Sequence, residues 1–231
     1  MLRLRRFTAR AALALLVALP CAAASLTPEE QRWLQGASPV LAFARSAGLP
    51  LDVIVQPQLT PRAAPLSLAF VEGRCKLVLS MRGNPEVAAS LSRIEPELLD
   101  VTLELMAAHE LGHCQRYVDG HWHGLPAGFA PRPLAVQDPV LRAEVEQMRA
   151  VRREEGYADL VGLAWVQQRH PALFPRLHAW LMAERSNGRV PGSHHDTLAW
   201  ARLARDGVTR DSASIFDAAA ALWSAGLLAD D

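Results

Sequence analysis

The stretch His109-Glu110-Leu111-Gly112-His113 stands in the middle of a long segment whose apolar residues recur at helical spacing, so that segment is predicted to be a helix. Residues four apart on a helix lie on one face, one turn above each other. The imidazoles of His109 and His113 can therefore bind a single Zn²⁺. Glu110 then flanks the metal, where a carboxylate suits a general base acting on metal-activated water.

A second helix is predicted over residues 140–168, and it carries Glu155-Gly156-Tyr157-Ala158-Asp159, an ExxAD sequence. Glu155 would supply the third metal ligand. Asp159 follows one helical turn later, where its carboxylate could orient a ligand histidine through a hydrogen bond. Two predicted helices thus each contribute half of one metal site.

Two other acids compete with Glu155 for the place of third ligand. Glu154 is adjacent, but on a helix it points about 100° away and has no acid four residues later. Asp119 follows His113 by six residues and would fit an HExxHxxGxxD site if Arg116 were a glycine. Without that glycine the helix has no obvious place to bend toward the metal. The sequence therefore favours Glu155.

Together the two motifs resemble those of the gluzincin metallopeptidases, and the ExxAD sequence is most similar to the family that includes HtpX and the CAAX prenyl endopeptidases. The resemblance covers these two motifs, and the transmembrane helices of that family are absent here. It implies a zincin-like fold with His109, His113 and Glu155 as zinc ligands. It also implies that Glu110 is the catalytic base and that Asp159 holds a ligand in place.

Catalysis of this kind needs a donor for the oxyanion, and the sequence offers two places for it. Ser193-His194-His195-Asp196 contains two histidines next to an acid that could hold one of them in a donating tautomer. Related families carry a histidine downstream of the third ligand, which points to His194 or His195. Tyr157, beside the third ligand, is the competing donor.

The rest of the chain predicts an α+β fold that is mainly helical, with a small sheet of three strands or slightly more. A helix begins at Thr27-Pro28, and a second short helix is expected from Ser38-Pro39 to about Gly48. Further helices are expected to begin at Asn84-Pro85 and Pro96-Glu97. Strands are predicted over 51–56, 66–71 and 75–80, and the remaining helices over 172–183, 196–204 and 212–228.

Two segments beside the predicted site could contact a substrate. The strand 75–80 immediately precedes the helices of the site, and in zincins an edge strand at this point receives the extended substrate by backbone hydrogen bonds; the alternative is a core strand. A loop rich in glycine and proline follows Gly120, and its Trp122, Leu125 and Phe129 could form a lid over the cleft.

The N-terminus has the pattern of a secretory signal over residues 1–24. Four arginines occur among the first ten residues, and a short apolar run and small residues follow. A lipoprotein signal with Cys21 as the lipidated residue is the alternative. Residues 25–231 are then predicted to be a single domain, exported to a bacterial periplasm or secreted, without a transmembrane segment.

Charge and composition exclude one class of partner. The 24 Lys and Arg residues balance the 24 Asp and Glu residues, and without the four N-terminal arginines 20 basic residues remain. The mature chain is thus mildly acidic and has no clustered basic face for nucleic acid. A protein or peptide substrate is the expected partner.

Loss of the signal would leave two cysteines, Cys75 and Cys114, in an oxidising compartment. They could form a disulfide that ties the metal-binding helix to the strand of Cys75. Two separate buried thiols are the alternative.

These observations predict a secreted zinc metalloendopeptidase of gluzincin type. The alternative is a zinc-containing periplasmic binding or quality-control module with little turnover. Glu110 favours catalysis, because a site that only holds zinc needs no base beside it. Hydrolysis of cell-wall peptide cross-links is a third hypothesis, which a basic or sugar-binding groove would support.

Overall fold

A computed structural model describes residues 25–58, 63–208 and 214–230. The predicted signal at 1–24 and the expected start of the last helix at Ser212 lie outside this part of the chain. Within it the fold is α+β, with a three-stranded mixed sheet and two long helices, as predicted. No helix of the described residues is both long and apolar enough to span a bilayer.

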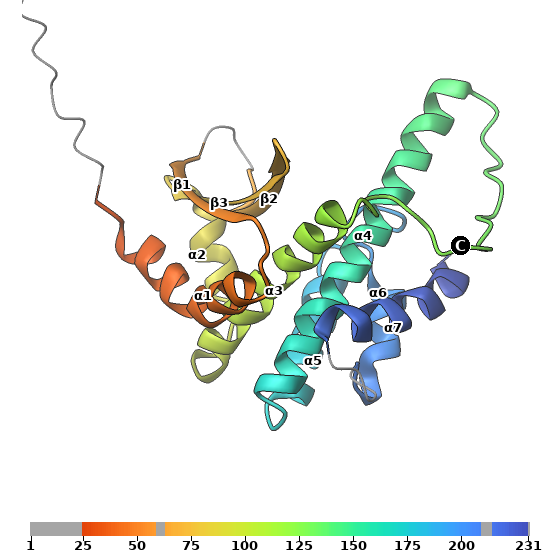
Figure 1. Ribbon diagram of the computed structural model, residues 1–231. Helices are drawn as coiled ribbons and strands as arrows, with labels where there is room; N and C mark the ends of the chain where they lie inside the picture. The colour runs from red at the N-terminus through yellow and green to blue at the C-terminus, as the bar shows by residue number, and fades with distance from the viewer. Residues whose placement is uncertain (1–24, 59–62, 209–213, 231) are drawn as a thin grey trace, which may run out of the picture.

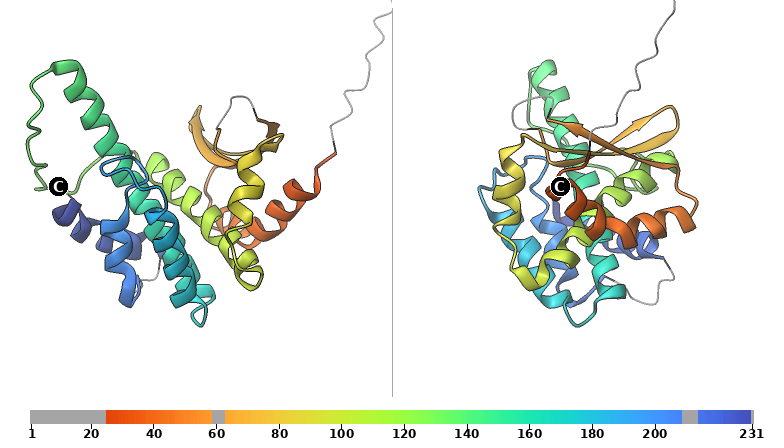
Figure 2. Two further views of the ribbon diagram at one scale, coloured as in Figure 1. Left: turned by 180° about the vertical axis from the view of Figure 1, so that it is seen from behind. Right: turned by 90° about the vertical axis from the view of Figure 1, so that its left-hand side faces the viewer.

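The elements divide into two halves (Figure 1). In Figure 2 the sheet, α1 and α2 lie on one side of α3, and α4 to α7 lie on the other. The strands are β1 (Leu51–Pro57), β2 (Leu66–Val71) and β3 (Arg74–Arg82). The helices are α1 (Pro28–Ser46), α2 (Pro85–Leu91), α3 (Leu99–Val118), α4 (Pro139–Arg169), α5 (Phe174–Ser186), α6 (Leu198–Leu203) and α7 (Ile215–Asp230), with short 3₁₀ turns η1 (Pro96–Leu98) and η2 (Ala204–Asp206).

Helix α1 corrects one prediction, because it continues through Pro39 as a single helix. Its start is the expected one: the Thr27 hydroxyl accepts a hydrogen bond from the backbone N–H of Glu30, whose carboxylate accepts one from the backbone N–H of Thr27. Ser38, however, does not cap a new helix, because its hydroxyl donates to the carbonyl of Gln35 at 2.7 Å. A continuous buried face on both sides of the proline, with Val40 fully buried, offsets the backbone hydrogen bond that Pro39 cannot make.

The sheet corrects a second prediction. Its strand order is β1-β3-β2, with β1 parallel and β2 antiparallel to β3. The strand predicted over 75–80 is therefore the central strand, paired on both sides, and cannot receive a peptide along an edge. Its Leu77 and Leu79 are buried against α1 and α3, which is why it lies in the middle. The tight turn between β2 and β3 is as predicted, with positive φ at Glu72 and Gly73.

Helices α3 and α4 approach each other closely because glycines lie between them. A Cβ at Gly112 would stand 2.9 Å from the Cα of Ala158, and a Cβ at Gly162 would stand 2.9 Å from the carbonyl oxygen of Leu105. Gly112 lies within the HExxH sequence and Ala158 within ExxAD. The absence of a side chain at Gly112 therefore allows the two motifs to lie close together.

Cys75 and Cys114 form a disulfide, which settles the alternative that the sequence left open. The bond joins β3 to α3 at the residue that directly follows His113. It closes a loop with a sequence separation of 39 residues, and both half-cystines are completely buried. The sheet is thereby fixed to the helix that carries the site.

Candidate metal centre and active-site cleft

Three side chains from two helices converge on one point. His109 and His113 come from α3 and Glu155 from α4, and one ligand atom from each lies within 4.8 Å of the others. The Nε2 atoms of the two histidines are 3.1 Å apart. The Glu155 carboxylate lies 3.4 Å from each of them. This group could hold a metal ion, as the spacing of the motifs predicts.

Asp159 holds His109 in the orientation that a metal ligand needs. Its Oδ1 lies 3.0 Å from Nδ1 of His109, so a proton on Nδ1 is donated to the carboxylate and Nε2 faces the other ligands. Asp159 is completely buried. Burial by itself would raise the pKa of its carboxyl, but Arg185 and His109 hold that pKa well below its usual range.

Two residues that the sequence did not predict complete the surroundings of Asp159. Arg185 of α5 donates to both carboxylate oxygens, at 2.8 and 2.5 Å. Thr197 donates its hydroxyl proton to Asp159 at 2.5 Å. Both partners are more than 25 residues away in the sequence, and no local pattern marks them. Asp159 thus receives hydrogen bonds from three segments.

The donor set fits a divalent first-row metal ion. Two imidazole nitrogens and one carboxylate are the ligands that catalytic zinc sites use, and non-haem Fe²⁺ sites use the same set. Burial lowers the pKa of His109, but hydrogen bonds to Asp159 and Glu155 outweigh it and raise that pKa to about 10. The ligands thus attract positive charge to this position. The Nδ1 atom of His113 is buried and has no hydrogen-bond partner in the described part of the chain.

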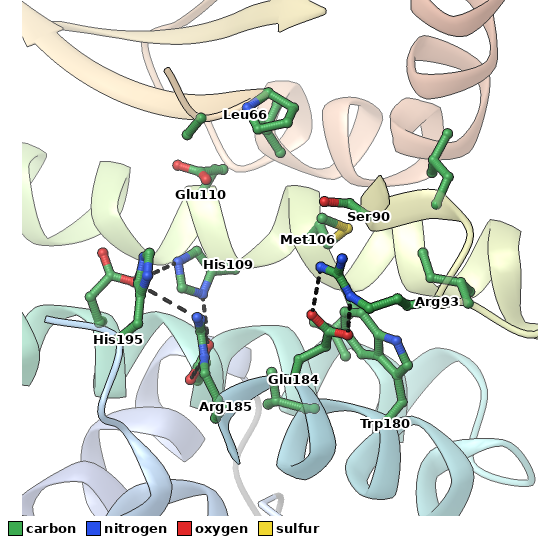
Figure 3. Close-up of a pocket in the computed structure, with 18 of the residues that line it drawn as sticks. Leu66, Ser90, Arg93, Met106, His109, Glu110, Trp180, Glu184, Arg185 and His195 are labelled. Carbon is green, nitrogen blue, oxygen red and sulfur yellow. Dashed lines mark hydrogen bonds and ion pairs between the residues drawn. The ribbon is translucent and has the colours of Figure 1, made fainter. Parts of the chain in front are cut away.

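Glu110 lies in the cavity beside the ligands. Figure 3 shows it between His109 and Leu66, on the upper wall of the cleft. Its side chain is buried, and this desolvation raises the pKa of its carboxyl above the ordinary value. No other acid takes this position among the described residues that line the cavity.

The cleft itself has a volume of about 210 Å³ and lies between the two halves of the fold. Its upper wall includes Ala64 and Pro65, which precede β2, and Leu66, the first residue of β2. Strand β2 is an edge strand of the sheet. Its lower wall is formed by α4 and α5. Figure 3 shows His109, Glu110 and His195 at one end of it. Glu155 also lines the cleft, beside His109 and His195.

Of the three candidate oxyanion donors, only His195 lines this cleft. Its Nε2 lies 3.7 Å from a carboxylate oxygen of Glu155. His194 lies against His195 but lines a separate hollow along the N-terminal half of α4. The proposal for Tyr157 is wrong, because its hydroxyl donates to the carbonyl of Phe216 on α7 at 3.3 Å. Helix geometry explains this, since a residue two positions after Glu155 points about 200° away.

Asp196 also differs from the expectation. It accepts hydrogen bonds from Arg189 and from the backbone N–H of Gly192, so it fixes the turn that carries His195 and does not orient a histidine. Burial and the nearby charge of Arg185 lower the pKa of His195 to about 4, although Glu155 opposes this. His195 is therefore neutral at neutral pH.

The two rival ligands stand outside the metal group among the described residues. Glu154 is buried and accepts two hydrogen bonds from Arg116, both at 2.9 Å, and a third from the backbone N–H of His123. Asp119 is exposed at the end of α3 and accepts a hydrogen bond from Gln115. Arg116 occupies the position where an HExxHxxGxxD site would have glycine, and it is bound to Glu154 instead.

The loop after Gly120 lies beside the centre. Trp122 stacks on Tyr117 with ring centroids 3.8 Å apart and meets the edge of His113 at 5.7 Å. Leu125 and Phe129 pack against the main core. None of these three predicted lid residues is among those that line the cleft.

Comparison of the chain with protein-family models, with curated proteins and with solved structures gave no match. Its function is therefore argued from the chemistry of the site.

Proposed function

We propose that this chain is a secreted zinc-dependent metalloendopeptidase with a zincin-like fold. The observation that carries the proposal is the convergence of His109, His113 and Glu155 on one point, with the carboxylate of Glu110 in the same cavity. A hydrolase is favoured over the oxygenases that share this ligand set, because a buried base beside the metal serves hydrolysis. The disulfide supports export, since such bonds persist in oxidising compartments.

Zinc bound by these ligands would polarise a peptide carbonyl and lower the pKa of water. Glu110 accepts the proton of the attacking water and passes it to the amine that departs. Burial raises the pKa of its carboxyl, which makes its carboxylate a stronger base for this proton. Asp159 and Arg185 keep the imidazole of His109 oriented while this happens.

His195 is the proposed donor to the oxyanion. A neutral imidazole has one N–H, and such a donor stabilises the negative charge that develops on the carbonyl oxygen. His195 stands at the metal end of the cleft on a turn fixed by Asp196. His194 is assigned no catalytic role, because it faces the other hollow.

Strand β2, and not β3, is the proposed edge for binding the substrate backbone. Among the described strands, β2 pairs only with β3, so its other edge is open to an extended peptide. The beginning of β2 lines the cleft opposite the ligands. A peptide added there would lie along the cleft that Glu110 and His195 also line.

The test is Glu110→Gln in the full chain, exported and purified with its metal. We expect about one zinc per chain in both proteins, cleavage of a peptide library by the wild type, and a loss of cleavage of at least 100-fold in the variant. Glu97→Gln, an exposed acid preceding α3, is the matched control and should keep full activity. Unchanged turnover in Glu110→Gln would exclude the proposed base. Stoichiometric zinc without cleavage of any peptide by the wild type would favour the binding module.

A further inference from the structure

Beyond the metal ligands the cleft becomes apolar. This part of its wall is contributed by α2 and the residues that follow it, by α3 and by α5. In Figure 3, Met106 and Trp180 lie at this end, on the far side of His109 from His195. The apolar half is lined by Leu91, Ile94, Leu105, Met106, Trp180 and Leu181.

The charged side chains around this half are already paired with each other. Arg93, just after α2, donates to both carboxylate oxygens of Glu184 on α5, at 2.8 and 3.0 Å. This ion pair crosses the rim from the upper half of the fold to the lower half (Figure 3). Arg185 is likewise neutralised by Asp159. Among the described residues, the apolar half therefore offers no unpaired charge to a charged group of a substrate.

We propose that the apolar half of the cleft is a subsite for one large hydrophobic side chain of the substrate, next to the scissile bond, and that the Arg93–Glu184 pair forms its rim. The inference rests on the proposed peptidase function and names the substrate class for the same site. A peptide in which leucine or phenylalanine stands beside the scissile bond is the expected substrate.

This preference follows from the cost of moving different substrate side chains from water into an apolar pocket. A leucine side chain that leaves water for this wall gains free energy in proportion to its apolar area, whereas alanine gains little. An aspartate or lysine would lose its hydration and find no free side chain of opposite charge there. Discrimination between side chains in such pockets is about tenfold or more for each methylene group.

The experiment uses acetylated and amidated peptides that differ at one position beside the bond cleaved by the wild type. We expect kcat/KM to be at least about tenfold higher for leucine than for alanine, and lower still for aspartate. Equal values for leucine, alanine and aspartate at each position flanking the bond would overturn the subsite.

A pair of variants locates the preference in this part of the cleft. Ser90 of α2 lines the cleft, so Ser90→Phe should fill the subsite and lower the ratio of kcat/KM for the leucine peptide over the alanine peptide at least tenfold. Ala88→Phe is the matched control, because Ala88 is exposed on the same helix and does not line the cleft. A Ser90→Phe protein that keeps the full leucine preference would contradict the assignment.

The rim is tested by Glu184→Gln and by the reversed pair Arg93→Glu with Glu184→Arg. Loss of the pair should widen the rim and raise the ratio of kcat/KM for tryptophan over leucine at least threefold, and the reversed pair should restore the wild-type ratio. A ratio that stays unchanged in Glu184→Gln would exclude the pair as the rim.

Failure of the peptidase proposal itself would look different. The Glu110→Gln protein with zinc bound should bind the leucine peptide at least tenfold more tightly than the alanine peptide by calorimetry. Such binding without cleavage by the wild type would support the subsite and refute the catalytic function. Cleavage by the wild type without any preference would support the catalytic function and refute the subsite.

Discussion

Gly112→Ala tests whether the close contact of α3 and α4 sets the geometry of the metal ligands. The new Cβ would stand 2.9 Å from the Cα of Ala158, whereas ordinary contact begins at 3.4 Å. Restoring ordinary contact would therefore move the two helices apart by about 0.5 Å. Metal–ligand distances tolerate only about 0.2 Å, and His109 and His113 lie on one helix with Glu155 on the other. The substitution should therefore weaken zinc binding.

The size of the effect follows from the strain. Overpacking of this kind costs about 1–3 kcal/mol, and the better helix propensity of alanine returns about 1 kcal/mol. We expect the free energy of unfolding of the metal-free protein to fall by about 0–2 kcal/mol. Zinc binding must draw the helices together again against similar strain, and about 1.4 kcal/mol lowers the affinity tenfold. Competition with a chromophoric chelator measures this affinity, and urea unfolding measures the stability.

Gly162→Ala is the matched control. Its Cβ would also stand 2.9 Å from α3, at the carbonyl oxygen of Leu105, but it lies seven residues after Glu155, about 10 Å along the helix. It should cost similar stability and change zinc affinity less than threefold. Zinc affinity in Gly112→Ala within twofold of the wild type, or an equal loss in both variants, would refute the reasoning.

Two further predictions concern the disulfide and the protonation of the ligands. Replacing both Cys75 and Cys114 by serine should lower the free energy of unfolding by about 4 kcal/mol, because the bond restricts a loop with a separation of 39 residues in the unfolded chain; urea titration tests this, and a loss below about 1 kcal/mol would contradict it. In the metal-free protein the pKa of His109 is raised to about 10 from an unfolded value of about 6.5. Its contribution to stability is therefore complete below about pH 6.5 and is lost as the pH rises toward 10, while zinc affinity rises because the metal displaces that proton. Thermal unfolding of chelator-treated protein across this range measures the effect, and a flat profile would show that His109 is not held protonated.

Most helices and strands could be predicted because the caps and turns that bound them are formed by residues close together in the sequence. Thr27 and Asn84 cap the helices that follow them, and the turn at Glu72-Gly73 sets the hairpin. The pairing of His109 and His113 could be predicted for the same reason, since helical spacing fixes which residues share a face. Glu155 on α4 could be predicted only because the ExxAD sequence resembles a known motif. Pro39 shows the limit of such signals. A helix start is overridden where tertiary packing buries a continuous face on both sides of it.

What could not be predicted depends on pairing between distant segments. Strand order is not encoded in any single strand, so β3 could be mistaken for an edge. Arg185 and Thr197 reach Asp159 only because α5 and the turn before α6 fold back onto α4. Asp196 and His195 are adjacent in the sequence, which suggested that Asp196 contacts His195, but in the structure Asp196 binds Arg189.

Three consecutive residues of α3 contact three different parts of the molecule, so the contacts of α3 with the two halves of the fold can be changed one at a time. Gly112 contacts α4, His113 faces the other ligands, and Cys114 is bonded to β3. Successive residues on a helix diverge by about 100°, so each contact can change without the next one. Loss of the disulfide should therefore cost stability and loosen the upper wall of the cleft while zinc affinity is kept. Crowding at Gly112 should weaken zinc binding at a small cost in stability. The geometry of the three candidate ligands is thus set by the contact of α3 with α4, whereas the sheet contributes to the opposite wall of the cleft.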